Sequence, residues 1–133
     1  MMLQLVKKRD IYGEIDSRYG ILLITINMIL NNLNNKEKLR EIVKTYEEEL
    51  EYPLDLDIIE DETERTILSI HDKLINLIFN YIKYLVELYV NDVFFIKLSM
   101  RKILEHLSKI IVKTRKRIED YIKYCEILIP SLI

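Results

Sequence analysis

Residues 54–129, a stretch of 76 positions, contain neither glycine nor proline. Both residue types interrupt helices, so a stretch of this length without them favours long helices. Nine positions inside it step alternately by four and three residues and are apolar with one exception: Met100, Leu104, Leu107, Ile111, Thr114, Ile118, Tyr121, Cys125 and Leu128. A period of 3.5 residues is typical of helices that pack side by side with knobs in holes. The sequence therefore predicts an all-α helical bundle.

The composition favours one folded domain whose helices depend on packing. A length of 133 residues suits a single domain, and 50% apolar with 32% charged residues is the balance of a folded chain. The chain has 23 Ile and 20 Leu but no Ala, the best helix former, so its helicity must come from packing. Abundant Ile, Lys and Asn without Ala favour an A+T-rich genome, and a single Gln favours a thermophile. We expect an archaeal or viral source.

Four helical segments are expected, and two of them lie in the N-terminal half. The first begins at Asp16 or Ser17, both good N-caps, and runs to the asparagines at 34 and 35. The residues before it form either a short helix or an arm. The second opens at Asn35 and ends before Pro53, because the residue ahead of a proline avoids the helical region. An acidic linker is expected at residues 53–60, since a single strand there would have no partner.

Two long helices are expected in the C-terminal half, at residues 61–91 and 92–128. Asp61 is the predicted N-cap of the first, and Glu64 completes a capping box. The pair Asn-Asp at 91–92 is the one break signal, so the alternatives are a turn and one continuous kinked helix. We favour the turn, because a helix of about 68 residues would be about 100 Å long at roughly 1.5 Å per residue.

Three apolar rows run along the helix predicted at 61–91, and they leave only a narrow polar stripe. The central row is expected to be its buried seam. That seam is Ile67, His71, Leu74, Ile78, Tyr81, Leu85 and Leu88; one flanking row is Leu68, Ile75, Ile82 and Tyr89; the other is Ile70, Leu77 and Tyr84. A helix that is apolar on most sides must be covered by several neighbours.

Charge is segregated along the chain, although the formal net charge is only -2. Residues 47–64 hold ten carboxylates and no base, whereas residues 97–123 hold nine Lys or Arg against three acids. The acidic segment is expected to be a solvated linker and helix start. Docking onto a basic partner is an alternative, as is a hard-cation site, for which Asp55 and Asp57 are too few to be specific.

The basic segment suggests contacts with phosphate groups. Its cations lie mostly off the apolar seam, where they form either an ordinary solvated face or a ridge that contacts nucleic acid without reading bases. The candidate nucleic-acid contacts are Lys109, Lys113, Arg115, Lys116 and Arg117.

No catalytic, cofactor or metal motif of good specificity is present in the sequence. Cys125 lies on the apolar seam, so we expect a buried thiol. His71 is expected to be a hydrogen-bonded core or interface histidine, because no second ligand stands at metal-binding spacing. Neither His71 nor His106 follows a glutamate by three residues, which excludes the di-iron pattern of helical bundles. No metal and no cofactor are expected.

No segment of the sequence resembles a membrane span or a signal peptide. The longest uncharged run, residues 19–35, carries five asparagines in its second half. The basic residues at 7–9 precede an apolar run, but acidic residues intervene and no small-residue cleavage site follows. We expect a cytoplasmic protein without a membrane partner.

Residues 101–106, Arg-Lys-Ile-Leu-Glu-His, are similar to the signature of the HEPN family, in which four residues separate an arginine from a histidine. Members of that family are small helical bundles that often act as dimeric, metal-independent ribonucleases. The resemblance implies that Arg101 steadies the scissile phosphate and that His106 transfers the proton of the attacking or leaving oxygen. Lys102 and Leu107 depart from the family pattern, which usually has a polar residue such as Asn and an aromatic residue there.

A looser similarity connects the chain to the helical domain of archaeal GINS replication-complex subunits. Tyr84, Leu85 and Leu88 approximate a tyrosine and leucine pattern on a long helix of that family. Lys97 and residues 115–129 stand for its basic positions and its terminal helix. The arginine-rich centre of the family is replaced here by Val-Asn-Asp-Val at residues 90–93.

The leading hypothesis is a non-enzymatic helical interaction or assembly protein, either oligomeric or a subunit of a complex. The seam of residues 100–128 extends over about 42 Å, longer than a bundle of this size needs to cover a partner helix. Nine tyrosines, each with an apolar body and a polar tip, favour the edges of an interface. The partner is a second copy or another helical protein, and the predicted interface residues are Met100, Leu104, Leu107, Ile111, Ile118 and Tyr121. The competing hypothesis is a ribonuclease that uses Arg101 and His106.

Overall fold

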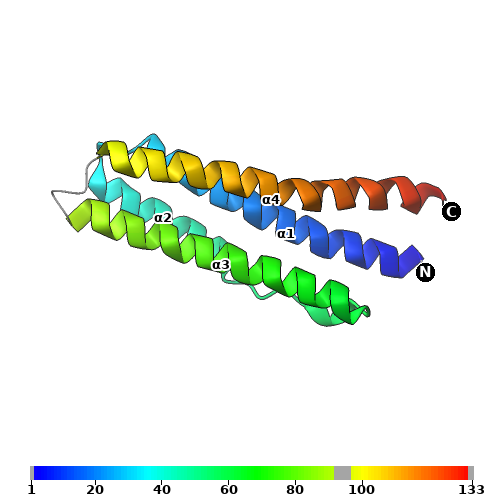
Figure 1. The fold of residues 1–133 in the computed structure, drawn as a ribbon. Coiled ribbons are helices and arrows are strands. Elements are labelled where there is room, and N and C mark those ends of the chain that lie inside the picture. The colour runs from blue at the N-terminus through cyan, green and yellow to red at the C-terminus, as the bar shows by residue number, and fades with distance from the viewer. Residues whose placement is uncertain (1, 92–96, 132–133) are drawn as a thin grey trace.

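The structure is a computed structural model, and it describes residues 2–91 and 97–131. It is an all-α bundle, as predicted, with four α-helices and no strand in the described residues. The helices are α1 (Met2–Leu30), α2 (Lys36–Leu50), α3 (Glu62–Asn91) and α4 (Lys97–Ser131), and a 3₁₀ turn, η1 (Leu56–Ile58), lies between α2 and α3 (Figure 1).

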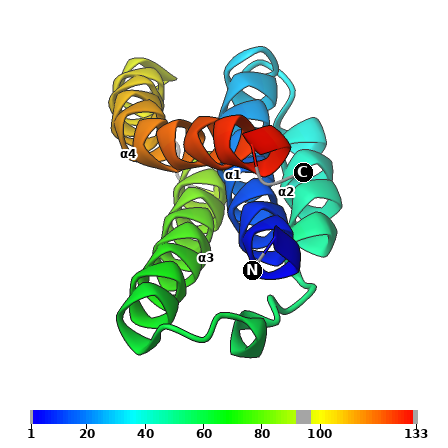
Figure 2. The ribbon, with the colours of Figure 1, turned by 90° about the vertical axis from the view of Figure 1, so that its right-hand side faces the viewer.

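The helices run alternately up and down, so the start of α1 and the end of α4 lie at the same end of the bundle (Figure 1). α1 is the central helix, because α4 packs along it and both α2 and α3 contact it (Figure 2). α3 also packs against α2, but its contact with α4 is much smaller than that between α1 and α4. The bundle is therefore asymmetric, with α4 attached mainly to α1.

α1 begins at Met2, so the predicted helix start at Asp16 or Ser17 is wrong. The residues expected to form a short helix or an arm are instead the first turns of α1. Burial of apolar side chains stabilises these turns, since most helical stability in proteins comes from packing. The buried residues of this part are Ile11, Tyr12 and Ile15. Asp16 does not act as a cap, because it lies inside the helix and its carboxylate binds Arg115 of α4.

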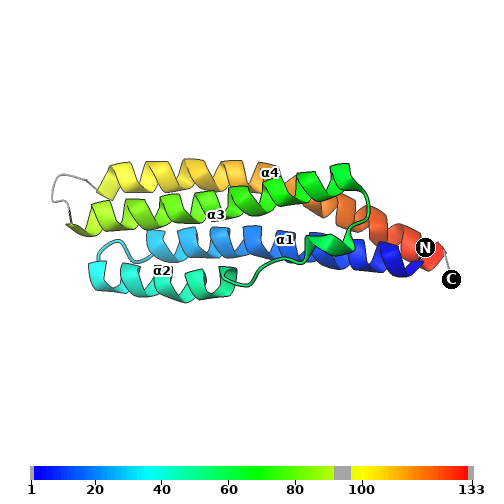
Figure 3. The same cartoon turned by 90° about the horizontal axis from the view of Figure 1, so that it is seen from below.

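α2 matches its prediction. The side-chain oxygen of its N-cap, Asn35, accepts a hydrogen bond from the backbone N–H of Lys38 at 3.2 Å. Its buried residues are Leu39, Ile42, Val43 and Leu50. After α2 the chain crosses to α3 through residues 53–60, which contain η1 and no strand (Figure 3). The fully buried side chain of Ile59 anchors this crossing.

α3 and α4 are separate helices that run in opposite directions, so one continuous kinked helix is excluded (Figure 3). α3 ends at Asn91, and Asp92, the second residue of the predicted break, lies outside the described residues. Asp61 caps α3 as predicted, because its Oδ1 accepts a hydrogen bond from the backbone N–H of Glu64 at 2.8 Å. α4 continues to Ser131, three residues beyond its predicted end.

The buried face of α3 differs from the predicted one. Of the two predicted flanking rows, the one that begins at Leu68 is buried and the one that begins at Ile70 is exposed. Ile67 and Tyr81 of the predicted seam are also exposed. The physical reason is the placement of α4, which lies mainly on α1 and leaves one side of α3 without a neighbouring helix among the described residues. The buried residues of α3 are Leu68, Ile75, Ile78, Phe79, Ile82, Leu85, Val86 and Tyr89.

The seam of α4 packs inside the chain, against α1. Met100 and Leu104 are both fully buried, and from Leu104 onward the members alternate between buried and partly buried positions, because the seam faces α1. The predicted interface residues Met100, Leu104, Ile111 and Ile118 are buried, and Leu107 and Tyr121 are partly buried. These six side chains belong to the core of the single chain and to its edge.

Truncation of the seam should destabilise the fold. We expect Leu104→Ala to lower the free energy of unfolding by about 2–5 kcal/mol, because Leu104 is fully buried and its removal leaves a cavity. Val112→Ala, on the exposed side of the same helix, should change it by less than about 0.5 kcal/mol. Urea unfolding followed by circular dichroism measures both, and equal effects would contradict this placement of α4.

Candidate functional site

α3 carries a row of apolar side chains that the described part of the chain leaves uncovered. Its members stand alternately three and four residues apart and therefore share one face of the helix. They are Ile67, Ile70, Leu74, Leu77, Tyr81 and Tyr84, which we call the α3 stripe. Leu74 is partly buried and the other five are exposed, Leu77 by 66% and Tyr84 by 58%.

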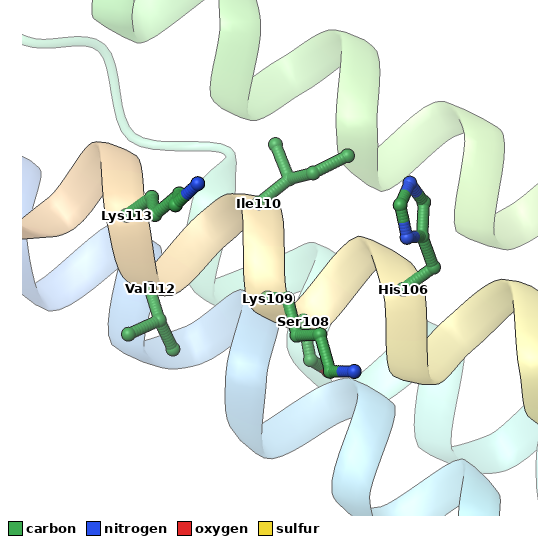
Figure 4. Close-up of a pocket in the computed structure, with 6 residues that line it drawn as sticks. All are labelled: His106, Ser108, Lys109, Ile110, Val112 and Lys113. Atoms are coloured by element: carbon green, nitrogen blue, oxygen red, sulfur yellow. The ribbon is translucent and has the colours of Figure 1, made fainter.

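α4 adds exposed apolar surface on its side toward α3. The side chains of Ile110 and His106 point toward α3, while Val112 points away from it (Figure 4). Ile110 is 44% exposed. An open depression of about 540 Å³ on this helix is lined by His106, Ser108, Lys109, Ile110, Val112 and Lys113 (Figure 4).

A polar cluster joins α1, α3 and α4 at the start of α3. The carboxylate of Glu64 accepts hydrogen bonds from the hydroxyls of Tyr12, at 3.0 Å, and Tyr121, at 3.2 Å. It also pairs with the ammonium of Lys8 at 3.0 Å, and the two tyrosine rings stack with centroids 3.9 Å apart. Burial, followed by the charge of Glu64, raises the pKa of both tyrosines, so their hydroxyls remain protonated donors. The carboxylate of Glu64 is thus used by this cluster and not by the capping box predicted with Asp61, of which only the hydrogen bond to the Asp61 side chain is formed.

Arg18 of α1 is a buried cation that the sequence reasoning missed. Its guanidinium donates to the backbone oxygens of Leu50, at 3.5 Å, and of Tyr52, and it pairs with the carboxylate of Asp72 at 3.5 Å. Within the described residues its Nε has no hydrogen-bond partner. These contacts hold the end of α2 and the start of the crossing against α1. The sequence signal was one arginine directly before an apolar run, but its acidic partner stands 54 positions away.

His71 and Cys125 have the environments predicted for them. The hydroxyl of Tyr19 lies 2.6 Å from Nδ1 of His71, and the two rings meet edge to face. Burial, followed by the charge of Arg117, lowers the pKa of His71 and favours its neutral form. Cys125 is buried, and burial raises the pKa of its thiol, which opposes the reactive thiolate form.

The two residues of the HEPN-like motif reach toward different neighbours. Residues five apart on a helix are separated by about 140° around its axis. Arg101 donates to the backbone oxygen of Leu30 on α1 at 3.4 Å and approaches Glu105 at 3.9 Å. His106 points toward α3 instead (Figure 4). Within one chain, the structure does not bring Arg101 and His106 together.

The five candidate nucleic-acid contacts divide into paired and unpaired cations. Arg115 donates to Asp16 at 2.7 and 3.1 Å and also pairs with Glu119, and Lys116 pairs with Asp120 at 3.2 Å. The remaining three are exposed and form no ion pair with any residue that the structure describes: Lys109, Lys113 and Arg117. Two further exposed lysines on α4 are Lys102 and Lys123.

Searches of protein-family models, curated proteins and solved structures find no match to this chain. The similarities to the HEPN and GINS families therefore rest on their motif residues alone. Of the GINS-like residues, Tyr84 is exposed and Leu85 is buried. The described residues contain no group of three His, Cys, Asp or Glu placed to hold a metal ion. None of the described helices is apolar over a length that could cross a membrane.

The pKa of His71 predicts a pH dependence of stability. Because its folded pKa lies below the ordinary value of 6.5, the unfolded chain binds more protons in the window beneath that value. The stabilisation is thus fully present above about pH 6.5 and is lost as the pH falls through the folded pKa. Urea unfolding between about pH 5 and pH 7.5 should show this loss, and His71→Gln should flatten it. The control is His106→Gln, which replaces an exposed histidine. The attribution to His71 would be contradicted if the free energy of unfolding kept the same pH dependence in His71→Gln, or if that dependence were weakened in His106→Gln.

Proposed function

We propose that this protein is a non-enzymatic helical assembly protein that binds a helix of another chain along the α3 stripe. The single observation that carries the proposal is that six apolar residues with coiled-coil spacing lie in line on α3, five of them exposed. A partner helix that presents apolar side chains with the same spacing would pack against them with knobs in holes.

The energetics favour a covered stripe. Complete burial of one Leu or Ile side chain contributes about 1.5–3 kcal/mol, and the stripe exposes several such side chains in one contiguous row. Contiguous apolar patches of this kind on a folded chain mark interaction sites, whereas single exposed apolar residues need no explanation. The two tyrosines supply hydroxyl groups that can stay hydrated at the rim of an interface.

A catalytic role has less support. Arg101 and His106 reach in different directions, and the one cysteine is buried. His71 is engaged by Tyr19, and Glu64 is engaged by two tyrosines and a lysine. The cysteine, His71 and Glu64 therefore serve the packing of the helices. An assembly role accounts for the exposed α3 stripe.

Light scattering tests the assembly role. At tens of micromolar we expect a mass above the 16.1 kDa of one chain, and we expect Leu77→Asp to return the protein to that mass, because a charge at the centre of the stripe cannot be buried there. Val112→Asp is the matched control, since Val112 is 56% exposed and points away from α3. A wild-type mass of one chain at this concentration would contradict the proposal.

A second candidate role is weak, sequence-independent nucleic-acid binding through α4. The observation that favours it is the set of exposed cations without an ion pair among the described residues, namely Lys109, Lys113 and Arg117, together with the exposed Lys102 and Lys123. Arg115 is withdrawn from this role, because Asp16 and Glu119 already neutralise it.

The salt dependence of binding tests this second role. Each phosphate contact should add about 0.9 to the slope of log affinity against log salt, so the variant Lys109→Glu with Lys113→Glu should flatten the slope and weaken binding to a DNA or RNA duplex. Lys38→Glu with Lys44→Glu, an equal charge change at exposed positions of α2, is the control. Equal losses in both variants, or an affinity that ignores salt, would rule out the α4 surface.

A further inference from the structure

We infer that the helix bound by the α3 stripe is the α3 helix of a second copy of this chain, paired antiparallel about a two-fold axis that passes between residues 75 and 76. The inference rests on the proposed assembly role and names its partner. It follows from the order, the size and the surrounding charge of the stripe residues.

The spacing of the stripe is the same when it is read in either direction. From Ile67 to Tyr84 the steps are three, four, three, four and three residues, and from Tyr84 back to Ile67 they are three, four, three, four and three again. Two copies placed antiparallel therefore keep every layer in register over about 26 Å, at roughly 1.5 Å per residue. This is the self-complementarity that a two-fold interface requires.

The sizes of the side chains favour the antiparallel pairing. Ile67 would lie opposite Tyr84 of the second copy, Ile70 opposite its Tyr81, and Leu74 opposite its Leu77. Each outer layer thus combines one aromatic with one branched aliphatic side chain, and the layers have similar volumes along the whole interface. Parallel pairing would instead place tyrosine on tyrosine in two layers and isoleucine on isoleucine in two others, which fills the layers unevenly.

The charges beside the two ends of α3 favour the same orientation. Exposed acidic residues surround the start of α3, and its end lies beside the start of α4 (Figure 1). That part of α4 carries Lys97, Arg101 and Lys102, all exposed. Antiparallel pairing brings the acidic end of one copy near the basic end of the other, whereas parallel pairing brings like charges together. The acidic residues are Asp57, Glu60, Asp61 and Glu62.

Disulfide trapping with single-cysteine chains tests the orientation. The two test chains carry Ile70→Cys or Tyr81→Cys, each combined with Cys125→Ala. Circular dichroism should first verify that both keep their helical content. In the antiparallel pair these positions face each other. Identical positions lie 11 residues apart along the axis, about 16 Å, which is beyond the roughly 7 Å that a disulfide spans between Cα atoms.

The mixture of the two chains should give about tenfold more crosslinked dimer than either chain alone, with the bond mapped between positions 70 and 81. Tyr81→Cys mixed with Val112→Cys should stay uncrosslinked. Crosslinking of each chain with itself would mean parallel pairing and would overturn the inference. A wild-type mass above one chain with no crosslink in any sample would also overturn it, while leaving the assembly role standing; a wild-type mass of one chain would reject both.

Discussion

The packing of α4 along α1 is the interaction on which the rest of the structure depends. The apolar seam of α4 is satisfied by α1, and the ion pair between Arg115 and Asp16 fixes the position of one helix along the other. At Gly20 a Cβ atom would lie 3.3 Å from the guanidinium of Arg115, so a larger residue there would require this group to shift slightly. Since α4 is held on α1, it contacts only a small part of α3 and leaves the stripe uncovered. The exposed stripe on α3 is therefore a direct consequence of the core.

This division of surfaces gives the molecule two different faces. One is the apolar α3 stripe, which suits a helix of a second chain. The other is on α4, where exposed lysines without described ion pairs suit polyanions. At the start of α3 the three helices α1, α3 and α4 are linked by an ion pair and two hydrogen bonds to Glu64. The two helices that carry these faces are therefore tied to each other at that end.

The sequence predicts the fold class and the α4 seam well, because a long 3.5-residue period has one simple structural meaning. It also predicts the N-cap at Asn35, because capping depends only on residues next to each other in the sequence. It does not predict which of three equally apolar rows of α3 is buried, since that choice depends on where α4 lies. It also misplaces the start of α1, because Asp16 resembles a cap but binds a partner 99 residues away. Arg18 was missed for a similar reason, as its partner lies on another helix.

Hydroxyl-radical footprinting as a function of concentration tests the central claim, that the stripe is free in a single chain and covered in the assembly. Tyr81 and Tyr84, exposed by 45% and 58%, should be oxidised rapidly at high dilution and protected at tens of micromolar. Tyr52, 74% exposed and outside the stripe, should be oxidised equally at both concentrations. Protection of Tyr81 and Tyr84 at high dilution would mean that the chain covers its own stripe. Equal oxidation at both concentrations would mean that nothing in the assembly covers it, and either result would contradict the account.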